Sequence, residues 1–418
     1  MKLFNLALKS LLNRKTSVCL TIVSISLSLF LFLGIQKVHT SAKNSFLGSV
    51  SNVDLIVGAR TGPVQLLLYS VFRLGEATAN ISWQSFKEFS QDPNVAWTIP
   101  ISLGDSHKGY RVVGTNQDYF KYYRYHGDKT LDFFEGKAFN DLFDVVLGYE
   151  VAKELNYALG ESIVVSHGVT PGEGALHDNA PFTISGILEK TGTPVDSSVH
   201  VSLEAIEAIH VGWSSGIVPD EYIPANELRS KNLEPKSITA FFVGLESKFG
   251  LFRFRHKIQQ YPKEALMGIL PGSSFQQLWE SVSLAETALM IVSAMVILTG
   301  ILGLVATILT SLESRRREMA ILRAVGARPF HIFFLLAMEA FLMAAIASIL
   351  TLGLLQAIEP LAAPMAMDYL GLRLNLETWT LFDLKVCAAV GILCIFSSLI
   401  PGWMAYKNSL SDGLSMRL

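Results

Sequence analysis

Four long apolar runs constrain the fold of this chain more than any other feature. They cover residues 18–35, 287–312, 332–358 and 386–406, and the only charged residue in them is Glu339. A helix rises about 1.5 Å per residue, so about 20 apolar residues cross a hydrocarbon core about 30 Å thick. The sequence therefore predicts a membrane α-helical protein with four transmembrane helices.

The first run follows a basic stretch, as the apolar part of a secretory signal peptide does. Its 18 residues exceed the roughly 7–15 residues usual for that part, and no A-x-A cleavage site follows. We therefore expect an uncleaved anchor. The second run has 26 residues, more than a bilayer requires, so its helix should tilt or project beyond the membrane.

Lysine and arginine in the short connecting segments predict the orientation, because cytoplasmic loops are enriched in them. Residues 1–17 hold four bases and no acid, segment 313–331 holds five arginines, and residues 407–418 add two bases. The short segment 359–385 instead holds four acids and two bases. We expect both termini and segment 313–331 in the cytoplasm, with segment 359–385 and the large domain 36–286 outside.

The large domain alternates short apolar strands with amphipathic helices, which is typical of an α+β fold. Ser202 is an expected helix N-cap. The domain contains no cysteine and so cannot form a disulfide. The elements fall in two clusters, which predicts two lobes. Expected strands cover 53–57, 111–114, 144–147, 162–166, 182–188, 199–201 and 238–245, and expected helices cover 83–90, 150–155 and 202–210.

Motifs for common chemistries are missing from the sequence. It has no G-x-x-x-x-G-K-[ST] phosphate loop, no H-E-x-x-H, no C-x-x-C and no G-x-S-x-G. The formal net charge is −2 and the large domain shows no basic cluster, so no nucleic-acid partner is expected. We assign no catalytic residue and no cofactor to the chain.

The segment between the second and third runs, LESRRREMAILRAVGARP, reads as a short amphipathic helix that ends at Gly326. Met319, Leu322 and Val325 follow one another at spacings of three and share one face. The arginines alone would also fit a segment that lies on anionic lipid. The apolar stripe and the abrupt Gly-Ala-Arg-Pro exit are not explained by that interpretation.

This segment resembles the pattern R-R-x-E-x-A-I-L-R-A-x-G-A, found between the second and third helices of the FtsX/MacB/LolC superfamily of ABC transporter permeases. A second resemblance lies in the large domain. There DVVLGYEVAKEL at 144–155, followed by 160–165 and 182–188, is similar to the MacB-type periplasmic domain. The order of one helix, a large outer domain and three helices also matches the family.

The resemblance implies a permease of the bacterial inner membrane with a periplasmic α+β domain. Such permeases dimerise with a second copy or a paralogue and bind a cytoplasmic ABC ATPase dimer. This chain lacks the nucleotide-binding domain fused in MacB, so ATP with Mg²⁺ would be bound by the separate ATPase. The residues expected to couple to the ATPase are Arg315, Arg316, Arg317, Glu318, Met319, Leu322, Arg323 and Gly326.

Three functions fit this architecture. The first is an ATP-driven permease that exports or extracts a substrate on the periplasmic side. The second is an FtsX-like regulator that transports nothing and acts on a periplasmic enzyme. The third is a sensor or handling component for a ligand or metal. The sequence does not name the substrate.

Two features of the large domain leave alternatives open. Four histidines are candidate metal ligands, although their spacing matches no known site: His167, His177, His200 and His210. The loop between the first two could instead contact a partner protein. The apolar stretch within 58–80 is either a buried helix or strand, or an exposed flap that touches lipid or a lipidated cargo.

Overall fold

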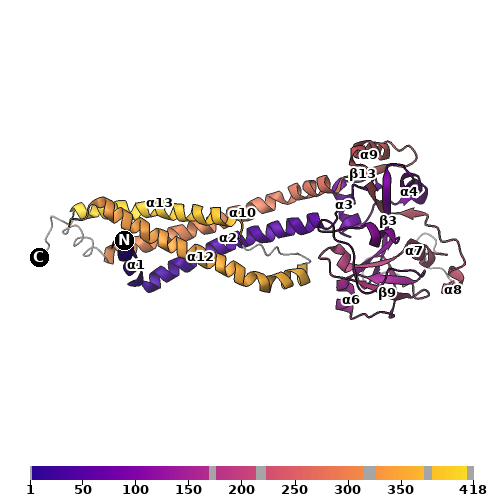
Figure 1. Cartoon of the computed structure of the whole chain (residues 1–418), viewed down its shortest axis with the longest axis horizontal. Coiled ribbons are helices and arrows are strands. Elements are labelled where there is room, and N and C mark those ends of the chain that lie inside the picture. The colour runs from indigo at the N-terminus through magenta and orange to yellow at the C-terminus, as the bar shows by residue number, and fades with distance from the viewer. Residues whose placement is uncertain (1, 169–175, 213–222, 315–325, 371–378, 412–418) are drawn as a thin grey trace. The chain divides into compact units, whose positions relative to one another are not determined.

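The structure is a computed structural model that describes residues 2–168, 176–212, 223–314, 326–370 and 379–411. The chain divides into two compact units. We call the unit of residues 1–41 and 283–418 the membrane unit, and the unit of residues 42–282 the outer domain. Figure 1 labels their helices and strands.

Within the described residues, four helices are long and apolar enough to cross a membrane. This confirms the predicted fold class. The four are α2 (Lys15–Gly48), α10 (Pro271–Ser314), α12 (Pro329–Leu370) and α13 (Leu381–Ser411) (Figure 1), and a shorter helix α1 (Lys2–Leu12) precedes them.

Helix α12 is longer than the sequence pattern predicts. It continues through Pro360 and Pro364 to Leu370, so the first part of the expected loop 359–385 is helical. Proline removes one backbone hydrogen bond and usually marks a helix end. Here the two prolines stand among leucine, alanine and methionine, which are strong helix formers.

Side chains from α1, α2, α10, α12 and α13 form the core of the membrane unit. Hydroxyl groups join helices within it: the Oγ1 atoms of Thr21 and Thr307 are 2.8 Å apart, and Thr351 Oγ1 donates to the Ser26 carbonyl at 2.9 Å. Such interhelical bonds and close contacts hold helices together in lipid. Glu339 is only 2% exposed in this unit.

The outer domain is built on one mixed sheet with strand order β13-β1-β12-β3-β4-β10-β6-β9-β5, with β7 added to β9 and β8 added to β3. A separate pair is formed by β2 and β11. The strands are β1 (Leu55–Ala59), β2 (Ile81–Ser82), β3 (Val95–His107), β4 (Tyr110–Thr115), β5 (Phe133–Gly136), β6 (Asp144–Leu147), β7 (Ser162–Ile163), β8 (Ser166–His167), β9 (Phe182–Leu188), β10 (Ser198–Ser202), β11 (Ser237–Ile238), β12 (Ala240–Leu245) and β13 (Leu266–Ile269).

Short helices cover this sheet (Figure 1). Ser202 caps α7 as predicted, because its Oγ accepts from the Ala205 amide at 3.0 Å. The helices are α3 (Pro63–Val71), α4 (Trp83–Ser90), α5 (Asp118–Tyr122), α6 (Tyr149–Leu155), α7 (Leu203–Ile209), α8 (Ala225–Leu228) and α9 (Leu251–Gln259), and two 3-10 turns cover Pro194–Ser197 and Lys248–Gly250.

Alternation along the central strands places apolar side chains on both faces of the sheet. In β1, Ile56 joins one core, whereas Leu55 and Val57 join another. A third core surrounds β6, β9, α6 and α7. The mixed sheet with its covering helices confirms the predicted α+β domain, whereas the division into two lobes stays a prediction.

The apolar stretch within 58–80 forms helix α3, whose Leu66, Leu67 and Tyr69 are at most 1% exposed. Phe72 follows the helix and contacts the rings of Phe46 and Phe275. The interpretation as a buried element is therefore confirmed for these residues. The alternative of an exposed flap is wrong, because the domain core covers these side chains.

Candidate functional site

The expected ATPase-coupling residues between Arg315 and Arg323 lie outside the described residues. Gly326 is described and has a φ of +97°. Glycine adopts this left-handed conformation without strain, and it commonly ends helices there. Helix α12 begins three residues later at Pro329, next to the Gly-Ala-Arg-Pro exit that the sequence predicted.

The outer domain brings four potential metal ligands together: Asp105, His167, His177 and His210. One ligand atom from each lies within 4.8 Å of all the others. Three of these residues were candidates from the sequence. His200, the fourth sequence candidate, is elsewhere: it is fully buried on β10 and lies against the rings of Tyr119 and Phe120.

Pairing between β3 and β8 places the first two ligands. The strands are antiparallel, with Asp105 directly opposite His167. Next to them, Ser166 Oγ donates to the Ser106 carbonyl at 3.0 Å, and Ser106 Oγ donates to the Gly168 carbonyl at 2.6 Å. Residues directly opposite on antiparallel strands have neighbouring side chains, so the register alone brings the carboxylate and the imidazole together.

Backbone contacts position the other two ligands. The amide of His177 donates to the Val165 carbonyl at 2.9 Å, which returns the chain to the start of β8. His210 is the C-cap of α7, and its Nδ1 bonds to the Ile206 carbonyl at 2.7 Å. A neutral imidazole that donates from Nδ1 keeps a lone pair on Nε2, and this Nε2 faces Asp105.

The distances between the ligand atoms are those of a small coordination site. His167 Nδ1 lies 3.1 Å from Asp105 Oδ1 and 3.1 Å from His210 Nε2. His210 Nε2 lies 3.5 Å from the same carboxylate oxygen. Bond lengths of about 2.0–2.1 Å in a tetrahedral zinc site place ligand atoms roughly 3.3 Å apart. The separations among these three atoms therefore suit one shared ion, and the His177 ligand atom lies within 4.8 Å of each of them.

Burial and hydrogen bonding set the charges in the cluster. Burial of Asp105 raises its pKa, but hydrogen bonds from His167 and His210 outweigh this and hold the pKa at about 2. Burial lowers the pKa of His177 to about 4. Burial also lowers the pKa of His210, but the contact with Asp105 outweighs it and the net shift is upward. Metals bind carboxylates and neutral imidazoles, so Asp105 and His177 are in ligand form near neutral pH.

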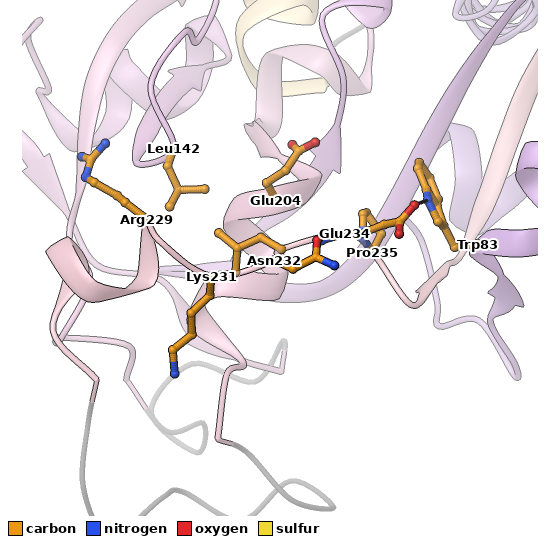
Figure 2. A pocket seen from close by; sticks show the side chains of 9 residues that line it. Trp83, Leu142, Glu204, Arg229, Lys231, Asn232, Glu234 and Pro235 are labelled. Carbon is orange, nitrogen blue, oxygen red and sulfur yellow. Dashed lines mark hydrogen bonds between the residues drawn. The ribbon is translucent and has the colours of Figure 1, made fainter.

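A pocket of about 600 Å³ opens elsewhere on the outer domain (Figure 2). Trp83 Nε1 donates to Glu234 at 3.0 Å on one side, and Arg229 pairs with Asp141 at 2.6 Å on the other. Charges of both signs surround the pocket, so it favours neither anions nor cations. It is lined by Trp83, Leu142, Glu204, Arg229, Lys231, Asn232, Leu233, Glu234 and Pro235.

The fold and these sites define a membrane protein whose membrane unit, in its described residues, has four helices long enough to cross a bilayer and whose outer domain is a large α+β fold. Residues 290–410 match the family described as FtsX-like permease C-terminal, and residues 18–227 match the family described as MacB-like periplasmic core domain. The second match covers half of the chain. The chain belongs to the MacB/FtsX-type family of ABC transporter permeases.

Two solved structures are similar to parts of the chain. The periplasmic region of MacB from Actinobacillus actinomycetemcomitans has 11% identity and a TM-score of 0.35, and the match covers 55% of this chain and 94% of that one. The extracellular domain of the ABC-type transporter YknZ from Gram-positive bacteria has 14% identity and a TM-score of 0.29, with coverage of 52% and 98%. No curated protein matches the chain.

Proposed function

We propose that this chain is the membrane subunit of an ATP-driven complex in the bacterial inner membrane. Its ATPase is a separate cytoplasmic subunit, because the sequence contains no phosphate-binding loop. ATP-driven motion of that subunit rearranges the periplasmic domain, which exports or extracts a substrate on the periplasmic side. The two family matches, which follow the chain in the order of the family's own domains, support this function.

The observation that carries the proposal is the length of helix α10. It has 44 residues, which corresponds to about 66 Å at 1.5 Å per residue, whereas the hydrocarbon core requires about 30 Å. Residues 271–282 belong to the outer domain and residues 283–314 to the membrane unit. One unbroken helix thus takes part in both units, which suits it to transmit motion between them.

The segment that follows α10 provides the contact to the ATPase. Arg315, Arg316, Arg317, Glu318 and Arg323 would form ion pairs with it, and Met319 and Leu322 would pack into its surface groove. An apolar contact ringed by charges is typical of protein interfaces. The left-handed Gly326 then allows the chain to return into α12.

Two substitutions in this segment test the contact. Leu322→Asp places a charge in the apolar stripe, and Glu318→Arg reverses a charge beside it. We expect both variants to insert normally but to lose the ABC ATPase, measured as ATP hydrolysis that co-purifies with the chain from bacterial membranes. Leu74→Asp is the matched control, because Leu74 is 57% exposed on the outer domain.

Retention of ATPase by Leu322→Asp and Glu318→Arg at the level of the Leu74→Asp control would contradict the proposed contact.

Among the alternative functions, one gains support from a specific observation. The cluster of Asp105 with three histidines favours a role that involves a metal ion.

A further inference from the structure

We propose that Asp105, His167, His177 and His210 bind a divalent transition-metal ion on the outer domain, with Zn²⁺ as the first candidate. Three imidazoles and one carboxylate are a donor set that Zn²⁺ and its first-row neighbours prefer. Mg²⁺ and Ca²⁺ prefer oxygen ligands and fit this set poorly. The proposal does not depend on the ATPase contact.

Three of the four ligand atoms face one another closely enough to share one ion. His167 Nδ1 and His210 Nε2 both face Asp105 Oδ1, at 3.1 and 3.5 Å, and lie 3.1 Å from each other. His210 Nε2 keeps its lone pair because Nδ1 donates to the Ile206 carbonyl, so without an ion it can accept a hydrogen bond from His167 Nδ1. A bound ion replaces that proton and accepts a lone pair from each ligand.

The surroundings meet the two further requirements of a metal site, which are held ligands and an entry path. The Ile206 carbonyl holds His210 by its Nδ1, as the outer hydrogen bonds of metal-binding histidines do. The side chain of Asp105 is 3% exposed, whereas that of His167 is 44% exposed. An ion can therefore reach the buried carboxylate from the side of His167.

Binding of an ion would connect parts of the fold that are distant in sequence. Asp105 lies on β3 and His167 on β8, whereas His210 ends α7. The ion would hold the end of α7 against the β3–β8 pair. The start of the same helix carries Glu204, which lines the pocket in Figure 2. Since an ion that binds only the folded state stabilises it, the thermal transition of the outer domain should rise with metal concentration.

The test uses the full chain in detergent, stripped with a chelator and titrated with Zn²⁺ or Co²⁺. We expect one ion per chain and a Co²⁺ visible spectrum of a four-coordinate site that Zn²⁺ abolishes. A double variant, His167→Ala with His210→Ala, should bind Zn²⁺ at least a hundredfold more weakly. His256→Ala is the matched control, because His256 is exposed on α9, and its affinity should equal that of the unmodified chain.

Three results would overturn the proposal. They are Zn²⁺ binding by the unmodified chain no tighter than by the double variant, an equal loss of affinity in His256→Ala, and tighter binding of Mg²⁺ or Ca²⁺ than of Zn²⁺. If the double variant does not fold, the Zn²⁺ affinities of the single variants Asp105→Asn and His167→Ala are compared with that of the unmodified chain instead, and an unchanged affinity in both would overturn the proposal. The first keeps the side-chain shape, and the second changes a side chain that is already partly in solvent. Each is compared with the unmodified chain by its thermal transition without metal.

Discussion

Single residues buried in the outer domain make its stability depend on pH, and His200 is the strongest case. Burial, and then the charge of Arg73, lowers the pKa of His200 from 6.5 to about 3. Below pH 6.5 the unfolded chain binds a proton there that the folded domain does not. Stability should therefore fall as the pH falls from 6.5 toward 3, by about 2 kcal/mol at pH 5 from this residue alone.

His200→Gln removes this proton uptake, so the difference in unfolding free energy between pH 7 and pH 5 should shrink by about 2 kcal/mol. Tryptophan fluorescence during denaturation of the detergent-solubilised chain measures it, since Trp83 and Trp97 lie in the outer domain. His256→Gln, at an exposed position, should leave the difference unchanged. An identical pH dependence in His200→Gln and the unmodified chain would show that His200 is not responsible.

Gly148 is a residue whose small size the packing requires. It caps α6, and a Cβ atom there would lie 2.2 Å from the Val195 carbonyl oxygen and 2.3 Å from that of Asp196. Both are backbone atoms, so the turn itself would have to move. We expect Gly148→Ala to destabilise the outer domain by about 1–3 kcal/mol.

The comparison for Gly148→Ala is Gly62→Ala, which also changes a helix-capping glycine. There the nearest atom to the added Cβ is 3.9 Å away, so stability should change little. Thermal unfolding of both variants measures the effect. Equal transitions in the two would be incompatible with the close contact at Gly148.

At the level of elements, β6 and β9 have the predicted bounds because each is a short apolar run between turn residues. Strand β3 was not predicted. Pro100 and Gly104 interrupt its pattern, and such residues usually mark the end of a strand. The structure accommodates them: Pro100 pairs with Phe241, and the register with β4 shifts between Leu103 and Ser106.

Because strand β3 was not predicted, Asp105 was not predicted as a ligand of the candidate metal site. Asp105 follows Gly104 in β3 and is 62 residues from His167, so no local spacing connects them. The contact of Asp105 with His167 arises from the β3–β8 register. The contact with His210 arises from the direction of α7 after its Ser202 cap. His200 and His210 flank the same helix, yet only His210 reaches the cluster. Strand pairing and helix direction bring these ligands together, and neither can be read from the spacing of the histidines along the sequence.

At the level of elements, the testable prediction concerns the transmission of motion by helix α10. Val282 stands at the end of the outer-domain part of the helix, and Val282→Pro would break the backbone hydrogen-bond ladder there at a cost of about 3 kcal/mol. If α10 transmits motion, this variant should bind and hydrolyse ATP through its partner but lose the ATP-dependent change in hydrogen exchange of the outer domain. Val282→Ala, which keeps the helix, should retain the change. An unaltered ATP response in Val282→Pro would exclude α10 as the transmitting element.

At the scale of the whole molecule, the proposed function requires the arginine-rich segment and the outer domain to lie on opposite faces of the membrane. The five arginines of 313–331 predict a cytoplasmic position, and one membrane crossing by α10 then places residues 42–282 in the periplasm. Protease added to spheroplasts should therefore cut the outer domain and spare an epitope tag inserted after Ala327, whereas inverted vesicles should show the reverse. The exposed Phe249 on the outer domain offers a position for a second tag as the internal control. Cleavage at both tags from one face of sealed membranes would contradict this topology, and with it the transmission of work by α10 from a cytoplasmic ATPase.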